Sequence, residues 1–448
     1  MTPWRRRAGP DGARPVWRRA AFVVLPAVLV VLLCAPGFPL SGDGTGFVLA
    51  SFSPQALDPV PIPLIRVGIV PAASQIRISC AGEWFLGITA SQLRPSAIAP
   101  GEAWRIRGTS RGVEVIDEQG VCRGVVQDTL YAYPANADED HIEIDGKRYR
   151  GQFLIWGHEK LSCANVVDLE SYLRGVVPQE IGNLPPEKRE AVKAQAVAAR
   201  SYTLAVMGRR MARGFDVYAT VEDQVYGGIP AERAPCTDAI EETRGVVALH
   251  KELPIRAFYS STCGGHTSAP DEAWKHRAEP YLKASADRTR RVEKCFCAQS
   301  PHYEWTEKWA GKDFQKMIDR SLPRYRPSYS PRRYGPLKNI TIAGRSASGR
   351  ISSLKLIFRH GSIELSGDEL RWVIRRPKNG EGLRSSLLRS VNCGSKKGRI
   401  TSVTITGQGY GHGVGMCQFG AMGMASAGYT YDQIIRFYYR GASLRRFY

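Results

Sequence analysis

Residues 166–207 read VVDLESYLRGVVPQEIGNLPPEKREAVKAQAVAARSYTLAVM. The first part is an apolar run, Pro185–Pro186 mark a loop, and the second part is rich in alanine. Prolines near a helix start, with Glu187 and Glu190 in the first turn, are the usual signals of a helix N-terminus. The pattern therefore predicts one long helix from about Glu187 to Met207.

Glu180 stands at the end of the apolar run, just before the loop. A carboxylate beside the positive end of a helix, among Val176, Val177 and Ile181, is a place where an acid of shifted pKa is expected. The competing interpretation is an ordinary loop acid, because charged side chains are mostly exposed. Glu180 is thus the first candidate for a chemical role.

The alanine-rich helix carries two further polar candidates. At 100° per residue, Gln195 shares a face with small or aromatic side chains: Ala191, Ala198, Ala199 and Tyr202. A buried amide on that face must find hydrogen-bond partners. Arg200 falls on the other side of the helix, beside Lys193. Small side chains let neighbouring backbones come close, so this pattern favours a packed central helix.

The net charge of +20 over 448 residues is concentrated in two places. Residues 1–40 carry six arginines against one aspartate, and residues 311–400 carry 21 Lys and Arg against 6 Asp and Glu. The rest of the chain is neutral. Positive charge concentrated in this way indicates a polyanionic partner, such as nucleic acid, anionic lipid or an acidic cell-wall polymer. A solvated basic face is the alternative.

The N-terminal residues decide between those partners. Arg5–Arg7 and Arg18–Arg19 precede the apolar segment Ala20–Ala35, which is typical of an export signal. The segment is short for a membrane span, yet no clear cleavage site follows it, so retention as an N-terminal anchor stays open. We therefore expect an exported protein, periplasmic or at the cell surface, and nucleic acid is not an expected partner.

The chain has ten cysteines, and in an exported protein cysteines can form disulfides. Nine remain when Cys34 of the export segment is set aside, so disulfides cannot use them all. Cys263 and His266 have zinc-like spacing, and Cys295 and Cys297 supply further ligands about thirty residues later. A disulfide from Cys263 to Cys295 or Cys297 is the alternative, since exported proteins keep disulfides. The sequence leaves a metal and a disulfide open.

Composition shifts divide the chain into segments. Residues 1–40 are the export signal or anchor, and 41–63 form a linker rich in Gly, Ser and Pro. Residues 64–157 contain short β runs (IRVGIV, QIRISCAG, EWFLGIT, RGVEVID, YRGQFLIWG) and predict a small β-rich domain. Residues 158–448 form the remaining domain, with a basic, β-rich segment at about 311–406 (NITIAG, ISSLKLIF, GSIELS, RITSVTITG) and one amphipathic piece, DELRWVIRR.

Other short stretches carry polar residues among turns and strands. Residues 221–229, VEDQVYGGI, hold Gln224 and Tyr226. GVVALH and PIRAFYSST predict two strands joined by a turn. From residue 407, GQGYGHGVGMCQFG alternates glycines, which permits close approach of a ligand or of another strand, and exposes His412 and Gln418. A structural histidine is the alternative for His412. The chain ends in a predicted short helix, YDQIIRFYY, stopped by Gly441.

Four of these stretches together resemble the SpoIID/LytB family of sporulation stage II protein D and amidase enhancers. They are YLRGVVPQE…AVKAQAVAARSY, DQVYGG, FYSSTCGGHTSAPDEAW and GQGYGHGVGMCQFGAMGMASAGYTYDQIIRFYYRG, spread over roughly residues 64–445. The resemblance implies an α+β fold, a β-rich scaffold with a central Ala-rich helix beside the active-site loop. It also implies an extracytoplasmic protein acting on peptidoglycan.

The resemblance also assigns roles. It places the family's catalytic acid on Glu180 and the arginine of its helix on Arg200. The candidate substrate-binding residues are Arg200, Gln195, Gln224, Tyr226, His412 and Gln418. Some family members bind zinc near the Gly-Gly turn, which would implicate Cys263 and His266 and allow a structural zinc as cofactor. The chain departs from the family in having Ile181 where Met is usual, a longer loop after Glu180, and Cys417 where Ser is common.

Three hypotheses for function follow. The first is a lytic transglycosylase, which cuts peptidoglycan glycan strands to 1,6-anhydro ends with one acid of raised pKa. The second is a non-catalytic peptidoglycan-binding protein that stimulates a cell-wall amidase. The third, a zinc-dependent hydrolase built on Cys263 and His266, is weaker, because cysteine-rich zinc sites are more often structural.

Overall fold

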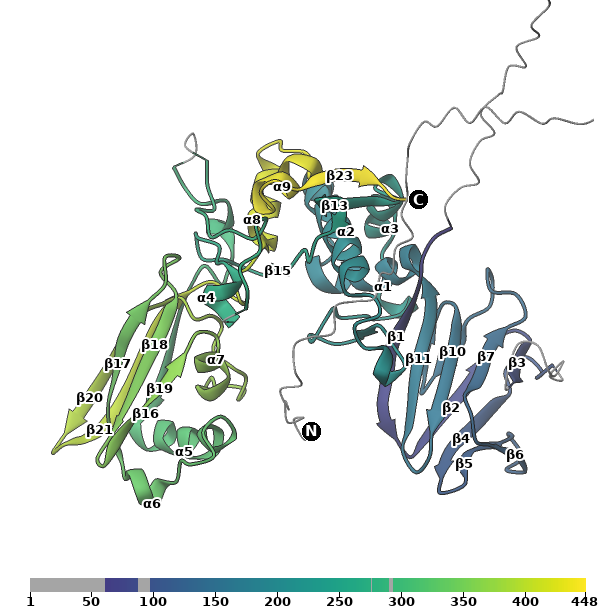
Figure 1. The fold of residues 1–448 in the computed structure, drawn as a ribbon, viewed down its shortest axis with the longest axis horizontal. Coiled ribbons are helices and arrows are strands. Elements are labelled where there is room, and N and C mark those ends of the chain that lie inside the picture. The colour runs from purple at the N-terminus through teal and green to yellow at the C-terminus, as the bar shows by residue number, and fades with distance from the viewer. Residues whose placement is uncertain (1–60, 88–96, 275, 290–292) are drawn as a thin grey trace, which may run out of the picture. The chain divides into compact units, whose positions relative to one another are not determined.

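The structure is a computed structural model, and it describes residues 61–448 except 88–96, 275 and 290–292 (Figure 1). The predicted export signal or anchor, 1–40, and residues 41–60 of the predicted linker lie outside the described residues. Strands and helices alternate irregularly along the chain, which confirms the predicted α+β class. No helix in the described ranges has the length and apolar character needed to cross a membrane.

The first of two six-stranded sheets includes β1, which follows the predicted linker. Its order is β12-β1-β11-β10-β7-β3, and β1 lies antiparallel to β11. The strands are β1 (Leu64–Ala73), β3 (Trp84–Gly87), β7 (Leu130–Pro134), β10 (Gln152–Gly157), β11 (Leu161–Asp168) and β12 (Val217–Tyr218). Because β10 and β11 form a hairpin, the expected boundary at 157/158 falls inside one sheet rather than between two domains.

A second six-stranded sheet has the order β6-β5-β4-β2-β8-β9. Its strands are β2 (Gln75–Cys80), β4 (Ala103–Thr109), β5 (Gly112–Ile116), β6 (Cys122–Val126), β8 (Ile142–Ile144) and β9 (Lys147–Tyr149). β2 alternates exposed and buried residues, so that Ile76 and Ile78 enter the core while their neighbours face outward. All five predicted β runs of residues 64–157 contain a strand. Their buried side chains join the same core as the helices that follow.

Helix α2 (Arg189–Val206) is the centre of that core and matches the predicted helix within two residues at its start and one at its end. Five of its six alanines (residues 191, 194, 196, 198 and 199) have no exposed surface, and their small size lets four other helices contact it. These helices are α1 (Leu169–Ile181), α3 (Ala234–Glu242), α8 (Gln418–Ser426) and α9 (Tyr431–Tyr438). The predicted C-terminal helix is α9, which begins at a capping box on Thr430.

The basic region has a core of its own. We call residues 304–408 the basic subdomain; it contains the predicted basic segment. Two three-stranded sheets, β16-β21-β20 and β17-β18-β19, pack with α5 and α7. Their bounds are β16 (Glu304–Ala310), α5 (Gly311–Ser321), β17 (Leu337–Arg345), β18 (Ile351–Phe358), β19 (Gly361–Ser366), α7 (Glu369–Val373), β20 (Leu388–Lys396) and β21 (Arg399–Gln408). The four predicted β runs of this segment are strands, and DELRWVIRR contains α7.

The predicted hairpin of GVVALH and PIRAFYSST is only partly present. β13 (Val246–His250) pairs with the two-residue β14 (Leu253–Pro254) and with β23 (Ser443–Arg446). The chain then leaves this sheet, and β15 (Tyr259–Ser260) pairs in parallel with β22 (Met416–Cys417). A Cβ atom on Gly415 would lie 1.9 Å from the Phe258 carbonyl oxygen, so this pairing requires glycine. The alternate glycines therefore serve the close approach of another strand.

Candidate active site

Glu180 lies in the last turn of α1 rather than in a loop. α1 begins at Asp168, whose side chain accepts a hydrogen bond of 3.0 Å from the Ser171 N–H, and ends at Gly182 with φ of 83°. Its buried face, which includes Val176 and Val177, packs into the main core. The carboxyl group at its end is therefore half-buried in apolar surroundings.

Two hydrogen bonds hold that carboxyl group. The Val225 N–H donates to Glu180 Oε1 at 2.9 Å, and the Tyr259 hydroxyl donates to the same carboxylate. Burial raises the pKa of Glu180 above its ordinary value, and these two hydrogen bonds offset part of the rise. Among the described residues, no cation shares in that balance. Glu180 thus keeps its proton to a higher pH than an ordinary glutamate.

The carboxyl group of Glu180 faces a pocket of about 220 Å³. The pocket is built from α1, α2, the loop at 221–225, β15, the short helix α4 (Pro270–Trp274) and the glycine loop before β22. Its lining residues are Glu180, Tyr202, Val221, Glu222, Asp223, Val225, Phe258, Tyr259, Trp274 and His412. Four of the ten are aromatic, and flat apolar faces beside a few polar groups suit a sugar ring.

Asp223, another carboxylate that lines the pocket, already has a cationic partner and two hydrogen-bond donors. It forms an ion pair of 2.7 Å with Arg210 and accepts hydrogen bonds from the Tyr202 hydroxyl and the Tyr218 N–H. Its side chain has no exposed surface. Asp223 therefore holds the 218–225 loop through these contacts, whereas Glu180 is the partly exposed acid with a raised pKa.

His412 lines the same pocket, as a neutral side chain. Its Nδ1 accepts a hydrogen bond of 3.0 Å from the Val414 N–H, which places the ring proton on Nε2. Burial lowers the pKa of His412 to about 3, and the charges of Arg371 and Arg350 act in the same direction. The ring packs against Trp274, with 4.7 Å between ring centroids. The remaining ring N–H of His412 bonds to the Tyr259 backbone, and the side chain carries no positive charge.

Two of the predicted substrate-binding amides, Gln418 and Gln195, lie next to each other, and Gln418 bonds to the backbone of Glu180. Gln418 Nε2 donates to the Glu180 carbonyl oxygen at 2.9 Å, and it lies 3.3 Å from Gln195 Oε1. Gln195 has no exposed surface. Gln418 therefore binds the backbone of Glu180, Gln195 contacts Gln418, and neither residue lines the pocket.

The remaining three substrate-binding candidates are buried away from the pocket. Gln224, with no exposed surface, donates to the Tyr259 hydroxyl at 3.0 Å. The Tyr226 hydroxyl donates to Asn165 Oδ1 at 3.0 Å and its side chain is 3% exposed. Arg200 has no exposed surface and forms a two-point ion pair with Glu170. Gln224 thus orients Tyr259, while Tyr226 and Arg200 join core elements and cannot reach a sugar chain as placed.

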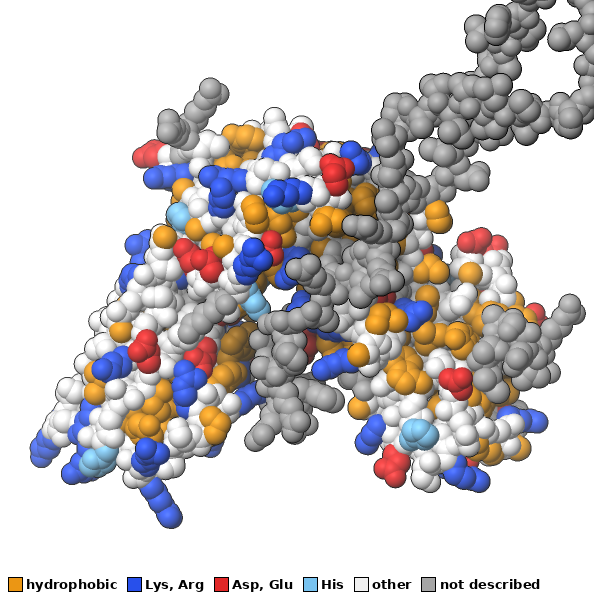
Figure 2. All heavy atoms as spheres, viewed as in Figure 1, with side chains coloured by type: hydrophobic (Ala, Val, Ile, Leu, Met, Phe, Trp, Pro, Cys, Tyr) orange, Lys and Arg blue, Asp and Glu red, His pale blue; other side chains and the backbone are white. Residues whose placement is uncertain are grey.

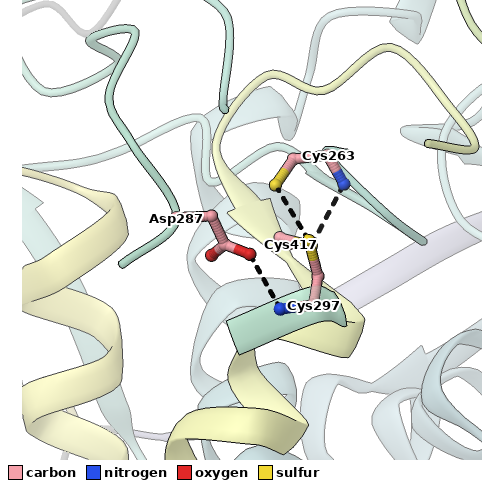
Figure 3. A group of neighbouring side chains, drawn as sticks. All are labelled: Cys263, Asp287, Cys297 and Cys417. Atoms are coloured by element: carbon pink, nitrogen blue, oxygen red, sulfur yellow. Dashed lines mark hydrogen bonds between the residues drawn. The ribbon is translucent and has the colours of Figure 1, made fainter. Parts of the chain in front are cut away.

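The residues that meet around Cys263 in the structure differ from those that the motif spacing predicted. Cys263 and Cys297 meet, with 3.6 Å between their sulfurs, and Cys417 and Asp287 complete a group whose ligand atoms all lie within 4.8 Å of one another (Figure 3). His266 Nδ1 is hydrogen-bonded 2.8 Å from the Thr267 carbonyl, and Cys295 Sγ lies 3.9 Å from the Gly265 carbonyl, so neither belongs to this group. The motif alone missed Cys417 and Asp287.

Several pocket residues also escaped the sequence argument. Tyr259, Phe258 and Trp274 lie within a quoted motif but were not singled out, and Asp223 adjoins Gln224. Their only local signal is aromatic side chains close to a glycine pair and to a small helix. A pocket formed by segments more than two hundred residues apart leaves no fixed spacing in the sequence.

Comparison with known proteins gives the chain its relatives. The family model SpoIID, described as Stage II sporulation protein, matches residues 157–250, and a Domain of unknown function (DUF8618) matches residues 268–415. An uncharacterised protein of Brachyspira hyodysenteriae is 29% identical over 332 residues, which cover 73% of this chain and 78% of that protein. The amidase enhancer of Bacillus subtilis is 28% identical over 353 residues, 70% of this chain and 47% of the enhancer.

The Stage II sporulation protein D of Bacillus amyloliquefaciens is 30% identical over 294 residues, 62% of this chain and 74% of that protein. The match of its name and of the SpoIID model agrees with the four sequence blocks described above. The chain belongs to the SpoIID/LytB family.

Proposed function

We propose that this protein is an extracytoplasmic lytic transglycosylase that cleaves the N-acetylmuramyl–N-acetylglucosamine strands of peptidoglycan to 1,6-anhydro products. One observation carries the proposal: a glutamic acid of raised pKa, with no cation beside it in the described structure, faces an aromatic pocket. The names of the family members, sporulation protein and amidase enhancer, agree with a role in peptidoglycan.

The reaction needs one tuned carboxyl group. Protonated Glu180 donates its proton to the glycosidic oxygen as the bond from the anomeric carbon to that oxygen breaks. The 6-hydroxyl of the same N-acetylmuramyl ring attacks the anomeric carbon, and its proton passes to the Glu180 carboxylate. One C–O bond forms for one that breaks, no water is consumed, and Glu180 ends protonated again.

The contacts of Glu180 suit both halves of that cycle. Burial favours the protonated form that starts the reaction. When the proton has left, the Val225 N–H and the Tyr259 hydroxyl donate to the carboxylate, so the ionised form is also accommodated. Because Gln224 Nε2 donates to the Tyr259 oxygen, the hydroxyl hydrogen of Tyr259 is left for Glu180.

The other two carboxylates that line the pocket are an aspartate paired with an arginine and an exposed glutamate. Glycosidases that use water need a base or nucleophile opposite the acid. Asp223 is held by Arg210 with no exposed surface, and Glu222 is exposed at the rim. An intramolecular nucleophile supplied by the substrate removes that requirement.

A pair of variants tests the proposal on purified glycan strands, with and without stem peptides. Glu180→Gln keeps the shape of the side chain and removes the proton, so release of anhydro ends should fall on the order of 10²–10⁴-fold. Glu222→Gln, which changes an exposed acid of the same pocket, should keep most of the activity. Mass spectrometry of the soluble products provides the measurement. If Glu180→Gln released as much anhydro product as wild type, Glu180 would not be the catalytic acid.

The similarity to the amidase enhancer favours a second candidate, a non-catalytic protein that binds peptidoglycan and stimulates a cell-wall amidase. The two candidates differ in one outcome. If wild-type protein yields no soluble product from glycan strands, yet increases the rate at which a purified amidase releases stem peptides from whole sacculi, the enhancer function holds. Glu180→Gln should then stimulate the amidase as well as wild type does.

A further inference from the structure

Three thiols and one carboxyl group lie together in the main core. Cys263 follows β15, Asp287 lies in the loop after α4, Cys297 belongs to the 3-10 helix η4 (Phe296–Gln299), and Cys417 ends β22 (Figure 3). All four residues have no exposed surface. Four segments of the chain therefore direct three thiols and one carboxyl group to one buried point.

The spacing of the ligand atoms fits one metal ion. Sulfurs bound to the same tetrahedral zinc at about 2.3 Å lie roughly 3.8 Å apart. The sulfurs of Cys263 and Cys297 are 3.6 Å apart, and all four ligand atoms lie within 4.8 Å of one another. Each of the nine cysteines in the described part of the chain carries a free thiol. The group thus has the size of a metal site before any metal is added.

The hydrogen bonds around the group favour negatively charged ligands. Cys417 Sγ accepts hydrogen bonds from the N–H groups of Cys263 at 3.1 Å and of Gly420 at 3.3 Å. Asp287 accepts from the Cys297 N–H at 3.0 Å and from the Tyr438 hydroxyl at 2.6 Å. Among the described residues, no cationic side chain is paired with Asp287. A buried carboxylate without a cation is costly, and a divalent ion would supply the missing positive charge.

We propose that Cys263, Asp287, Cys297 and Cys417 bind one zinc ion. Three thiolates and one carboxylate oxygen fill a tetrahedral shell, and full burial leaves no position for water or substrate, so the ion is structural. Binding releases the protons of the coordinating thiols to solvent. The ligand set replaces His266 and Cys295 of the sequence motif with Cys417 and Asp287.

The zinc site would hold together the segments that position the acid. Cys417 accepts from Gly420 at the start of α8 and precedes Gln418, which donates to the Glu180 carbonyl. Cys263 lies four residues after Tyr259, which donates to the Glu180 carboxylate. The ion therefore fastens the pair β15–β22 from inside the core. This inference does not depend on the proposed reaction, because an amidase enhancer would need the same core.

Metal content tests the ligand set directly. We expect one zinc per chain in wild-type protein purified without chelator, measured by plasma mass spectrometry and by mass spectrometry of the native protein. Cys417→Ser and Cys297→Ser should lower zinc content by about tenfold or more. Cys295→Ser and His266→Ala, which change the motif residues outside the group, should keep it. Zinc retained in Cys417→Ser but lost in His266→Ala would overturn the assignment.

Thiol alkylation of the wild-type protein separates a metal from a disulfide without any variant. If zinc holds the three thiols, denaturant together with chelator should make Cys263, Cys297 and Cys417 reactive without a reductant. Should two of the three react only after reduction, a disulfide replaces the metal site and the proposal is wrong. Full alkylation in denaturant alone, with no zinc released, would also contradict it.

Discussion

Arg200 and Glu170 form a buried ion pair whose loss should destabilise the whole core. Arg200 Nε donates to Glu170 Oε1 at 2.8 Å and Arg200 Nη2 donates to Oε2 at 2.6 Å. The side chains are 0% and 2% exposed. The pair connects α1 to α2, and a third bond of 3.1 Å from Arg200 Nη1 to the Val246 carbonyl adds β13.

Arg200→Met removes the cation and keeps an apolar side chain of similar length. Glu170 is then left as a buried carboxylate without a cation, which costs about 3–5 kcal/mol of unfolding free energy. Solvent does not screen this pair, because neither side chain is appreciably exposed. Since a domain is typically stable by about 5–15 kcal/mol, the variant should retain only part of its stability.

Urea unfolding followed by circular dichroism and tryptophan fluorescence measures that loss. The double variant Glu170→Leu/Arg200→Met removes both charges together and should recover most of the lost stability, because no charge is left unpaired. Arg445→Met is the matched control, because its ion pair with Glu252 has side chains 62% and 69% exposed. Its effect should stay below about 1 kcal/mol.

The result that would refute this reasoning is specific. If Arg200→Met unfolds at the same urea concentration as wild type but binds glycan strands more weakly, Arg200 contacts the substrate, as the family resemblance implied. If the double variant is less stable than either single variant, the pair contributes through packing rather than through charge.

Three further predictions concern the acid and the basic subdomain. In Tyr259→Phe the Glu180 carboxylate loses a donor, so the pKa of Glu180 should rise further and the alkaline limb of the pH–rate profile for glycan cleavage should move to higher pH; an unmoved or lowered limb argues against this contact. Because folding raises the pKa of Glu180, the folded state binds more protons, and this contribution to stability is complete at low pH and is lost as pH rises through the raised pKa. Glu180→Gln should therefore gain stability relative to wild type on going from acidic to neutral pH in urea titrations, and a constant difference would contradict the raised pKa. The exposed residues Lys396, Lys397 and Arg399 lie at the β20–β21 turn. Changing all three to Glu should weaken sacculus binding in pull-down assays at low salt and have little effect at high salt. Equal binding of the variant and wild type at low salt would show that this face does not bind the sacculus.

The salt prediction rests on how charge is placed in the basic subdomain. Residues 311–400 carry 21 Lys and Arg against 6 Asp and Glu, and Figure 2 shows several of these basic side chains at the outer edge of the region. Arg326, Arg371 and Arg376 are neutralised by acidic partners. The exposed cations at the strand ends are left to attract an acidic polymer, an interaction that salt screens.

Local pattern predicted the elements whose side-chain period is clear. The alanines of α2 and the alternating strands of residues 64–157 and 311–406 follow periods that depend only on near neighbours. The sequence pattern does not predict α1, which contains Gly175 and Pro178, two residues that disfavour a helix. Packing against α2 overrides that preference: a Cβ atom on Gly175 would lie 2.5 Å from the Tyr226 ring, so the glycine makes room for a core side chain.

The candidate site was predictable only where one motif contained the answer. Glu180 was predictable because it ends the apolar run before the long helix, and the family block ends on the same residue. Half of the proposed zinc ligands were predictable, because Cys263 and Cys297 lie 34 residues apart while Cys417 lies 154 residues after Cys263. The odd number of cysteines after residue 40 was the available signal that disulfides could not use them all, but no local spacing pointed to Cys417.

Several polar residues of the sequence motifs contact Glu180 or its hydrogen-bond partner Tyr259 and do not line the pocket. Gln224 orients Tyr259, Tyr259 donates to the Glu180 carboxylate, and Gln418 holds the Glu180 carbonyl. An acid in an apolar setting works only if its carboxyl group stays where burial raises its pKa, since a carboxyl free to rotate into water would return to its ordinary value. Amides that never touch substrate are therefore as necessary as the acid. It follows that Gln224→Leu or Gln418→Leu should change the pH dependence of the reaction more than its Michaelis constant, the reverse of what substrate-binding residues would do.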